Sequence, residues 1–195
     1  MNSSRKDTTS RPAVFLDRDG TINVEKDYLY KVEDFEFIPG APEAIKRLKD
    51  AGYLVVVVTN QSGVARGYYT LADVDRLHDH LSASLLSYQT SVDGFYVCPH
   101  HPNAGDSELT GDCSCRKPSP GMLLAAACDL NVDLARSWMV GDKLADIEAG
   151  LQAGVRPLMV ATGYGEKARV AMRYDSVQAF PSIVEAVEHI LDLDD

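Results

Sequence analysis

Four short apolar runs recur along the chain. They are Ala13–Leu16, Leu54–Val58, Trp138–Val140 and Leu158–Val160. A strand that is covered on both faces of a sheet shows no polar alternation, because neither of its faces meets water. We therefore expect these runs to form parallel strands that are buried on both sides.

Helical periodicity fills the segments between the apolar runs. The predicted helices are Pro42–Lys49, Leu71–Tyr88, Ser119 to Asp129, Leu144–Ala153 and Ile183–Leu191. Thr70 and Asp73 have the spacing of a capping box, while Ser119 and Pro120 suit an N-cap and a first helical position. Strands that alternate with helices predict a doubly wound α/β fold with right-handed crossovers. In such sheets ligands bind at the carboxyl ends of the strands.

Length and composition limit the number of domains and the kinds of partner that the chain can have. A chain of 195 residues with 45% hydrophobic content can form one core, so we expect one domain over residues 12–195 after a disordered tail, residues 1–11. The net charge of −10 disfavours nucleic acids and anionic membranes as partners. Neither a secretory segment nor a membrane span is apparent, which predicts a cytoplasmic protein, and we expect a monomer.

Two carboxylates follow the first predicted strand, in the run Asp17-Arg18-Asp19-Gly20-Thr21. Phosphoryl transfer needs an in-line nucleophile, a cation for the phosphoryl oxygens and an acid for the leaving oxygen. Asp17 could attack phosphorus and bind Mg²⁺, while Asp19 protonates the departing alkoxide and then activates water. Taken alone, such a pair is more often a solvated acidic turn at the end of a strand.

Further polar groups stand where later strands end. Thr59 closes the second strand and could hold a phosphoryl oxygen, and Lys117 precedes a helix and could supply a positive charge there. Asp142 follows the third strand, with Asp146 one helical turn later, so both could face a Mg²⁺ ion. Polar turns, solvated lysines and acidic helix starts are the plain alternatives. Those alternatives do not explain why the groups occur in order at successive strand ends.

In these motifs the chain resembles the haloacid dehalogenase-like phosphatases, from about residue 13 to residue 163. The resemblance implies a Rossmann-like core in which Asp17 forms an aspartyl-phosphate and Asp19 is the acid and base. It implies that Thr59 and Lys117 steady the phosphoryl group. The implied Mg²⁺ ligands are the carboxylates of Asp17 and Asp142 and the backbone carbonyl of Asp19. Asp146 would then orient Lys117 or a metal-bound water.

A long stretch without periodicity, Pro99 to Pro118, lies between two cysteine-containing segments. Residues two apart in extended backbone point the same way, so each segment could offer two ligands to one tetrahedral Zn²⁺. The candidate ligands are Cys98, His100, Cys113 and Cys115. A structural Zn²⁺ would order a loop that has no core of its own. Locally packed reduced cysteines are the alternative, His101 competes with His100, and Cys128 is expected in the core.

A finer resemblance, to the D-glycero-D-manno-heptose 1,7-bisphosphate 7-phosphatase family, lies in four segments: 17–23, 58–67, 98–102 and 115–123. It implies a capless Mg²⁺-dependent enzyme in which the zinc loop, residues 98–115, stands over the site. The implied substrate is a small phosphorylated sugar that loses its 7-phosphate during synthesis of nucleotide-activated heptose. Arg116 suits the phosphate that is not cleaved. The implied substrate contacts are Arg18, Glu25, Lys26, Asp27, Tyr28, Asn60, Gln61, Ser62, Arg116 and Lys143.

The chain departs from that family in one loop and leaves two other functions open. Glu25 to Tyr28 stand where the family tends to have Asp-His-Gly-Tyr, so Asp27 occupies a glycine position; Tyr28 could still contact the sugar. Histidinol-phosphate phosphatases share the machinery and a similar metal loop, although the run Gln61–Gly67 favours the heptose enzymes. A non-catalytic phosphosugar-binding protein is the alternative of another class, and the full set of carboxylates argues against it.

Overall fold

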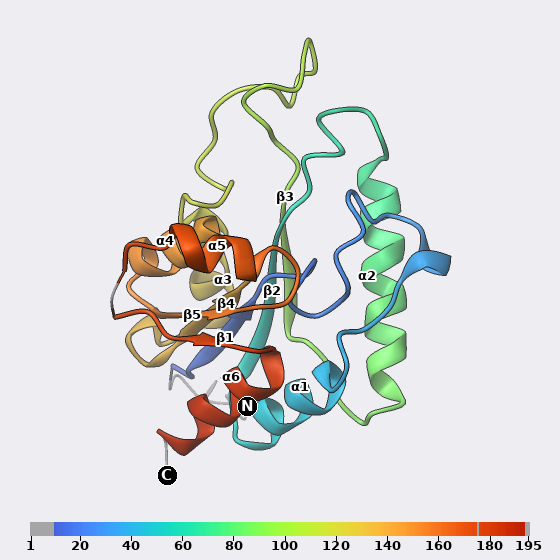
Figure 1. The fold of residues 1–195 in the computed structure, drawn as a ribbon. Helices are drawn as coiled ribbons and strands as arrows, with labels where there is room; N and C mark the ends of the chain where they lie inside the picture. The colour runs from blue at the N-terminus through green and yellow to red at the C-terminus, as the bar shows by residue number, and fades with distance from the viewer. Residues whose placement is uncertain (1–9, 175, 194–195) are drawn as a thin grey trace, which may run out of the picture.

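One sheet of six parallel strands organises the computed structural model, which describes residues 10–174 and 176–193 (Figure 1). The strands are β1 (Ala13–Leu16), β2 (Leu54–Asn60), β3 (Gly94–Cys98), β4 (Trp138–Gly141), β5 (Arg156–Val160) and β6 (Ala179–Phe180). Their order in the sheet is β3-β2-β1-β4-β5-β6, which confirms the predicted doubly wound α/β fold. The four strands predicted from the sequence form its centre.

Helices cover both faces of this sheet. They are α1 (Ala41–Asp50), α2 (Leu71–Leu86), α3 (Gly121–Leu130), α4 (Leu144–Ala153), α5 (Gly165–Ala171) and α6 (Ile183–Asp192), with 3-10 turns η1 (Val32–Asp34) and η2 (Leu134–Arg136). Val14 and Leu16 belong to the core cluster that includes α1, α2 and α6, whereas Ala13 and Phe15 belong to the cluster that includes α3 and α4. Alternate residues of a strand point to opposite faces, so β1 is fully buried.

The edge strands β3 and β6 and the short helix α5 were not predicted from the sequence. In β3 only Cys98 is fully buried, and β6 has two residues, so neither presents the long apolar run of a central strand. Helix α5 has seven residues, of which only Gly165 is buried. Elements that contribute little to the core carry little hydrophobic pattern, and this is why they escaped detection.

Of the two helix caps predicted from the sequence, before α2 and before α3, the structure confirms the first. The capping box before α2 is confirmed, because Thr70 Oγ1 accepts from Asp73 N at 3.2 Å and Thr70 N donates to Asp73 Oδ2 at 2.7 Å. The predicted N-cap of α3 was wrong: Pro120 caps the helix in place of Ser119. Gly121 then packs directly on the cysteine loop, where a Cβ atom would lie 2.2 Å from Ser114 O.

The strand order defines where a ligand can bind. From β1 the chain proceeds outward to β2 and β3, and it then crosses back to β4 and proceeds the other way. Such a reversal leaves a crevice at the carboxyl ends of the two central strands. Asp17 follows β1 and Asp142 follows β4, and the backbone amide of Asp17 donates to Val140 O at 3.0 Å. Both carboxylates therefore stand at the crevice.

The predicted aperiodic segment contains no helix or strand between β3 and α3 apart from an isolated bridge of His101 with Thr110. Figure 1 shows it as a yellow-green loop that projects beyond the carboxyl end of the sheet. Of the predicted disordered tail, residues 1–9 lie outside the described residues. Arg11 is held in place, since its guanidinium donates to Gly52 O at 2.9 Å. Over the described ranges, no helix is long and apolar enough to cross a membrane.

Candidate active site

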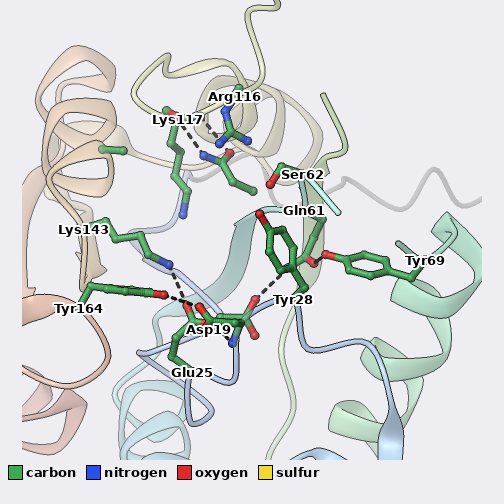
Figure 2. Close-up of a pocket in the computed structure, with 13 residues that line it drawn as sticks. Asp19, Glu25, Tyr28, Gln61, Ser62, Tyr69, Arg116, Lys117, Lys143 and Tyr164 are labelled. Carbon is green, nitrogen blue, oxygen red and sulfur yellow. Dashed lines mark hydrogen bonds and ion pairs between the residues drawn. The ribbon is translucent and has the colours of Figure 1, made fainter. Parts of the chain in front are cut away.

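Five polar side chains from different parts of the chain meet at the crevice. They are Asp17, Thr59, Lys117, Asp142 and Asp146, and none is more than 4% exposed. A cavity of about 370 Å³ opens beside them (Figure 2). Ten residues predicted for the site line it: Asp19, Glu25, Asp27, Tyr28, Asn60, Gln61, Ser62, Arg116, Lys117 and Lys143. Three that the sequence analysis missed also line it: Tyr69, Ala145 and Tyr164.

Lys117 is the buried cation of the site. Its Nζ donates to Asp17 Oδ1 at 2.8 Å and to Val58 O at 2.7 Å, and it forms an ion pair with Asp146 Oδ1 at 2.6 Å. Burial alone would lower the pKa of Lys117, but the Asp146 and Asp17 carboxylates outweigh it and raise the pKa. The ammonium therefore stays charged beside Asp17.

Asp142 is the carboxylate of the site with an oxygen that accepts no hydrogen bond, and its charged neighbour is Lys143, whose Nζ lies 3.8 Å from Oδ1. Its Oδ2 accepts from the Tyr164 amide at 2.7 Å, but its buried Oδ1 has no hydrogen-bond partner. Burial and the Asp17 carboxylate raise the pKa of Asp142 to about 8. Close packing around it requires glycines, because a Cβ atom at Gly20 or Gly163 would come within 2.3 Å of Oδ2.

A divalent cation fits this group. Ligand oxygens of Asp17, Asp142 and Asp146 lie within 4.8 Å of one another. Lys117 pairs with Asp17 and Asp146, while Lys143 stands 3.8 Å from Asp142. Both oxygens of Asp146 are engaged, by Lys117 Nζ and by the Lys143 amide, whereas Asp142 Oδ1 accepts no hydrogen bond and stands 3.8 Å from Lys143 Nζ, so it can still bind an ion. An oxygen-rich anionic pocket is what Mg²⁺ prefers, so Asp17 and Asp142 suit it better than Asp146 does.

Asp19 is held by a network beside the cavity. Its carboxylate accepts from Arg18 Nη2 at 2.9 Å, from Asn23 Nδ2 at 2.9 Å and from Gln61 Nε2 at 2.9 Å. Burial by itself raises the pKa of Asp19, but the Arg18 charge and the hydrogen bonds from Asn23, Arg18 and Gln61 outweigh it, so the pKa is lowered. Asp19 is consequently ionised in this arrangement.

Two of the predicted substrate contacts do not line the cavity. Arg18 is fully buried, and besides Asp19 it contacts Leu29 O at 3.1 Å and His78 Nε2 at 3.3 Å. Its guanidinium therefore makes its contacts inside the protein, where it orients Asp19. Lys26 is also absent from the lining of the cavity and pairs with Glu36 at 3.3 Å. A sequence motif places a residue near the site but does not fix the direction of its side chain.

Gln61 links the network to β2. Its Nε2 donates to Asp19 Oδ2 and, at 2.8 Å, to Thr59 Oγ1. Tyr69 fixes this orientation, because its hydroxyl donates to Gln61 Oε1 at 2.6 Å. Figure 2 shows Tyr69 reaching Gln61 from the side opposite Lys143 and Tyr164. The sequence carried no motif for this role.

His78 is expected to make the protein acid-sensitive. Burial and the Arg18 charge lower the pKa of His78 from 6.5 to about 3. Between these values the unfolded chain binds a proton and the folded protein does not, so stability is full above about pH 6.5 and falls as the pH drops toward 3. Between pH 7 and pH 5 the expected loss in the free energy of unfolding is about 2 kcal/mol.

Urea unfolding of the wild type and of His78→Gln at both pH values measures this loss. The glutamine retains an acceptor for Arg18 and does not titrate, so the variant should lose about 2 kcal/mol less than the wild type on acidification. Equal losses in the two proteins would show that His78 is not the group responsible.

The cysteine loop gathers four metal-type ligands in the predicted set. Atoms of Cys98, His100, Cys113 and Cys115 lie within 4.8 Å of one another. His100 Nδ1 lies 3.7 Å from Cys98 Sγ and 3.4 Å from Cys115 Sγ. His101 points elsewhere, with its Nδ1 accepting from the Asn103 amide at 3.0 Å. Cys128 was expected in the core, but it is exposed on the face of α3 opposite the sheet.

The cluster is joined to the cavity by short contacts. Asn60 binds the backbone of Lys117 in both directions, at 3.0 Å and 3.1 Å. Arg116 Nη1 donates to His100 O at 3.1 Å. Arg116 is thereby tied to the cysteine loop through His100, and Lys117 is tied to β2 through Asn60. A metal bound in the loop would act on Arg116 through the His100 backbone.

Comparison with known proteins agrees with this geometry. A haloacid dehalogenase-like hydrolase family matches residues 14–77, and a HAD-hydrolase-like family matches residues 114–186. A D-glycero-beta-D-manno-heptose-1,7-bisphosphate 7-phosphatase of Escherichia coli (strain K12) is 49% identical over 79% of this chain and 81% of its own. One from Haemophilus ducreyi is 44% identical over 92% of this chain and 98% of its own.

The chain belongs to the heptose 1,7-bisphosphate 7-phosphatase family of haloacid dehalogenase-like hydrolases. A solved structure of this heptose phosphatase family, from B. bronchiseptica and in complex with magnesium and phosphate, superimposes with a TM-score of 0.84. It is 36% identical and covers 93% of this chain and 99% of its own. The predicted family is thus confirmed. The magnesium in the B. bronchiseptica structure agrees with the fit of a divalent cation at Asp142.

Proposed function

We propose that this protein removes the 7-phosphate of D-glycero-β-D-manno-heptose 1,7-bisphosphate. The names of its relatives support the substrate and the β anomer. The observation that carries the chemistry is the buried group of Asp17, Lys117 and Asp142, in which one carboxylate oxygen accepts no hydrogen bond. Such a group suits phosphoryl transfer because it offers a nucleophile and positive charge at one point.

Asp17 is the proposed nucleophile, and its carboxylate attacks phosphorus to form an aspartyl-phosphate. Lys117 holds one Asp17 oxygen and neutralises charge on the transferring group, while the Thr59 hydroxyl binds a phosphoryl oxygen. Mg²⁺, held by Asp17, Asp142 and the backbone carbonyl of Asp19, would supply further positive charge to the phosphoryl oxygens. Asp146 keeps Lys117 in place.

Asp19 is the proposed acid and base. Ionised by its contacts with Arg18 and Gln61, it is ready to activate water against the aspartyl-phosphate. To protonate the leaving oxygen it must first bind a proton itself. An anionic phosphate beside it favours that step, because a neighbouring negative charge raises the pKa of a carboxyl group.

The cavity divides into a phosphate side and a sugar side. Arg116 is proposed to bind the phosphate that is not cleaved, since a guanidinium matches phosphate with two hydrogen bonds. The sugar hydroxyls would meet the remaining polar side chains of the lining: Glu25, Asp27, Tyr28, Asn60, Gln61, Ser62 and Lys143.

A structural Zn²⁺ is proposed for the cysteine loop, with Cys98, His100, Cys113 and Cys115 as ligands. In a tetrahedral site with bonds of about 2.3 Å the ligand atoms stand about 3.8 Å apart. Four separations between these atoms, from 3.4 to 3.7 Å, come near that value, while Cys98 Sγ and Cys115 Sγ stand closer, at 2.9 Å. Reduced thiols of this kind suit a cytoplasmic enzyme.

Steady-state kinetics on three substrates test the function. The purified protein with Mg²⁺ is assayed on both anomers of heptose 1,7-bisphosphate and on histidinol phosphate, with EDTA as the control. We expect kcat/KM for the β anomer to exceed the other two at least about tenfold, the effect of one well-placed hydrogen bond, and EDTA to abolish it. A preference for histidinol phosphate would contradict the substrate, and turnover of none would favour the non-catalytic alternative.

A further inference from the structure

A hydrogen bond between Tyr164 and Asp27 joins two loops on the side of the cavity away from Tyr69. The Tyr164 hydroxyl donates to Asp27 Oδ1 at 2.5 Å, although 137 residues separate them in the chain. Tyr164 precedes α5, and Asp27 belongs to the segment after β1. In Figure 2 Tyr164 and Lys143 lie together across the cavity from Tyr28 and Tyr69.

The segment that holds Asp27 has an unfavourable backbone. Asp27 and Tyr28 are consecutive non-glycine residues in the left-handed region, with φ of 44° and 60°. Such a conformation persists only where surrounding contacts enforce it, and it is common at binding sites. Its side-chain contacts must therefore hold the segment in place, and Tyr164 supplies one of them.

Neighbouring contacts fasten the same segment. Glu25 Oε1 accepts from the Asp27 amide at 3.0 Å, and Glu25 Oε2 accepts from Lys143 Nζ at 3.0 Å. Lys143 Nζ in turn lies 4.9 Å from the centre of the Tyr164 ring. On the other side the Tyr28 ring meets the Tyr68 ring edge-on, with centroids 4.9 Å apart.

These residues form a wall between two cavities. Glu25, Asp27 and Tyr164 line the catalytic cavity and also a neighbouring one of about 430 Å³. The hydrogen bond between Tyr164 and Asp27 therefore lies in the wall that the two cavities share.

Charge indicates which part of a ligand meets the wall. Glu25 is paired with Lys143 at 3.0 Å, so the carboxylate that repels a phosphate group there is that of Asp27. Hydroxyl groups, which donate hydrogen bonds, suit carboxylate oxygens better. The hydrogen bond to Asp27 and burial raise the pKa of Tyr164 to about 12, so its hydroxyl remains a donor over the working pH range.

We propose that Tyr164 is a specificity-determining positioning residue, which through its hydrogen bond to Asp27 holds the 25–28 segment as the wall of the sugar side. It thereby selects phosphate esters whose hydroxylated chain fills the cavity. This role rests on the proposed function, because it presupposes a sugar substrate. It differs from a catalytic role, since Tyr164 is not placed at the reacting phosphate.

Kinetics of Tyr164→Phe measure the effect, with heptose 1,7-bisphosphate and the sugar-free ester p-nitrophenyl phosphate as substrates. The ratio of kcat/KM for the heptose to kcat/KM for the sugar-free ester should fall about tenfold, as expected for one lost hydrogen bond to a charged group. The fall should appear in KM for the heptose, with kcat changed less than about twofold.

Tyr96→Phe is the matched control. It removes one hydrogen bond from a tyrosine to an aspartate, Tyr96 to Asp129 at 3.0 Å, at a place remote from the cavity. The ratio should stay at the wild-type value. If Tyr164→Phe behaves like this control, the proposal is wrong.

A double-mutant cycle with Asp27→Gly shows whether Tyr164 acts through Asp27. In the glycine background Tyr164→Phe should change the ratio less than about twofold, because the acceptor is already gone. An equal tenfold fall in both backgrounds would mean direct contact with substrate and would overturn the positioning role. A wild type that hydrolyses p-nitrophenyl phosphate but not the heptose ester would instead refute the proposed substrate.

Discussion

Replacement of Asp17 by asparagine should lower kcat on heptose 1,7-bisphosphate at least about 10⁴-fold, because the amide cannot attack phosphorus. The same change removes a ligand of the proposed Mg²⁺ site. Asparagine has nearly the same shape, so the site retains its packing. No aspartyl-phosphate should form when the reaction is quenched with acid.

The fold should survive this replacement. Lys117 retains Asp146 at 2.6 Å and Val58 O at 2.7 Å after the Asp17 charge is lost. Removal of that charge also relieves its repulsion of Asp142. The free energy of unfolding without metal should therefore change by no more than about 2 kcal/mol, the usual range for a single substitution.

Three measurements check these results: kcat, acid-quench trapping of the phosphoenzyme, and urea unfolding. Asp50→Asn is the matched control, since it removes an aspartate from an exposed pair with Lys46 at 2.7 Å, outside the cavity. It should leave kcat unchanged. If Asp17→Asn retained a tenth of the wild-type activity, Asp17 would not be the nucleophile.

Loss of the zinc ligand Cys113 should have the largest effect on stability. In Cys113→Ser one thiolate of the proposed Cys₃His site is gone, and Zn²⁺ bound in structural sites contributes on the order of 10 kcal/mol to folding. We expect bound zinc to fall from about one ion per chain to well below half, with the melting temperature lowered by about 5 °C or more. The loop should lose order before the sheet does.

Zinc content by elemental analysis and thermal unfolding followed by circular dichroism test this expectation. Cys128→Ser is the control, because it changes an exposed cysteine outside the cluster. It should retain full zinc and the wild-type melting temperature. Full zinc occupancy in Cys113→Ser would refute the ligand set. On p-nitrophenyl phosphate Cys113→Ser should lose far less activity than Asp17→Asn, since zinc acts at a distance from the phosphoryl group.

The central part of the fold could be predicted because buried strands must be continuously apolar. β1, β2, β4 and β5 were found on this ground. The edge strands β3 and β6 were not, because half-exposed or two-residue strands need no such pattern. The start of α3 was misplaced by one residue, because the amide of Gly121, the first residue of the helix, donates to Ser114 O at 3.0 Å and no side chain caps the helix.

In the active site the sequence predicted which residues carry the chemistry better than it predicted the contacts of their side chains. Asp17, Lys117 and Asp142 were found from their places after strands, and the structure brings them together. Asp27 stands where related enzymes tend to have glycine, yet its backbone still adopts φ of 44°. Aspartate tolerates that conformation better than most residues, so the position does not require glycine for this backbone.

By itself the sequence determined which residue types stand at the carboxyl ends of the strands, because hydrophobic periodicity and motif spacing are local properties. Only the tertiary structure decided where their side chains point. Arg18 turned inward to Asp19 and His78, Tyr69 came to orient Gln61, and Tyr164 met Asp27 in the wall of the cavity. Contacts between residues so distant in the chain depend on the packing of whole elements, and no local pattern encodes them.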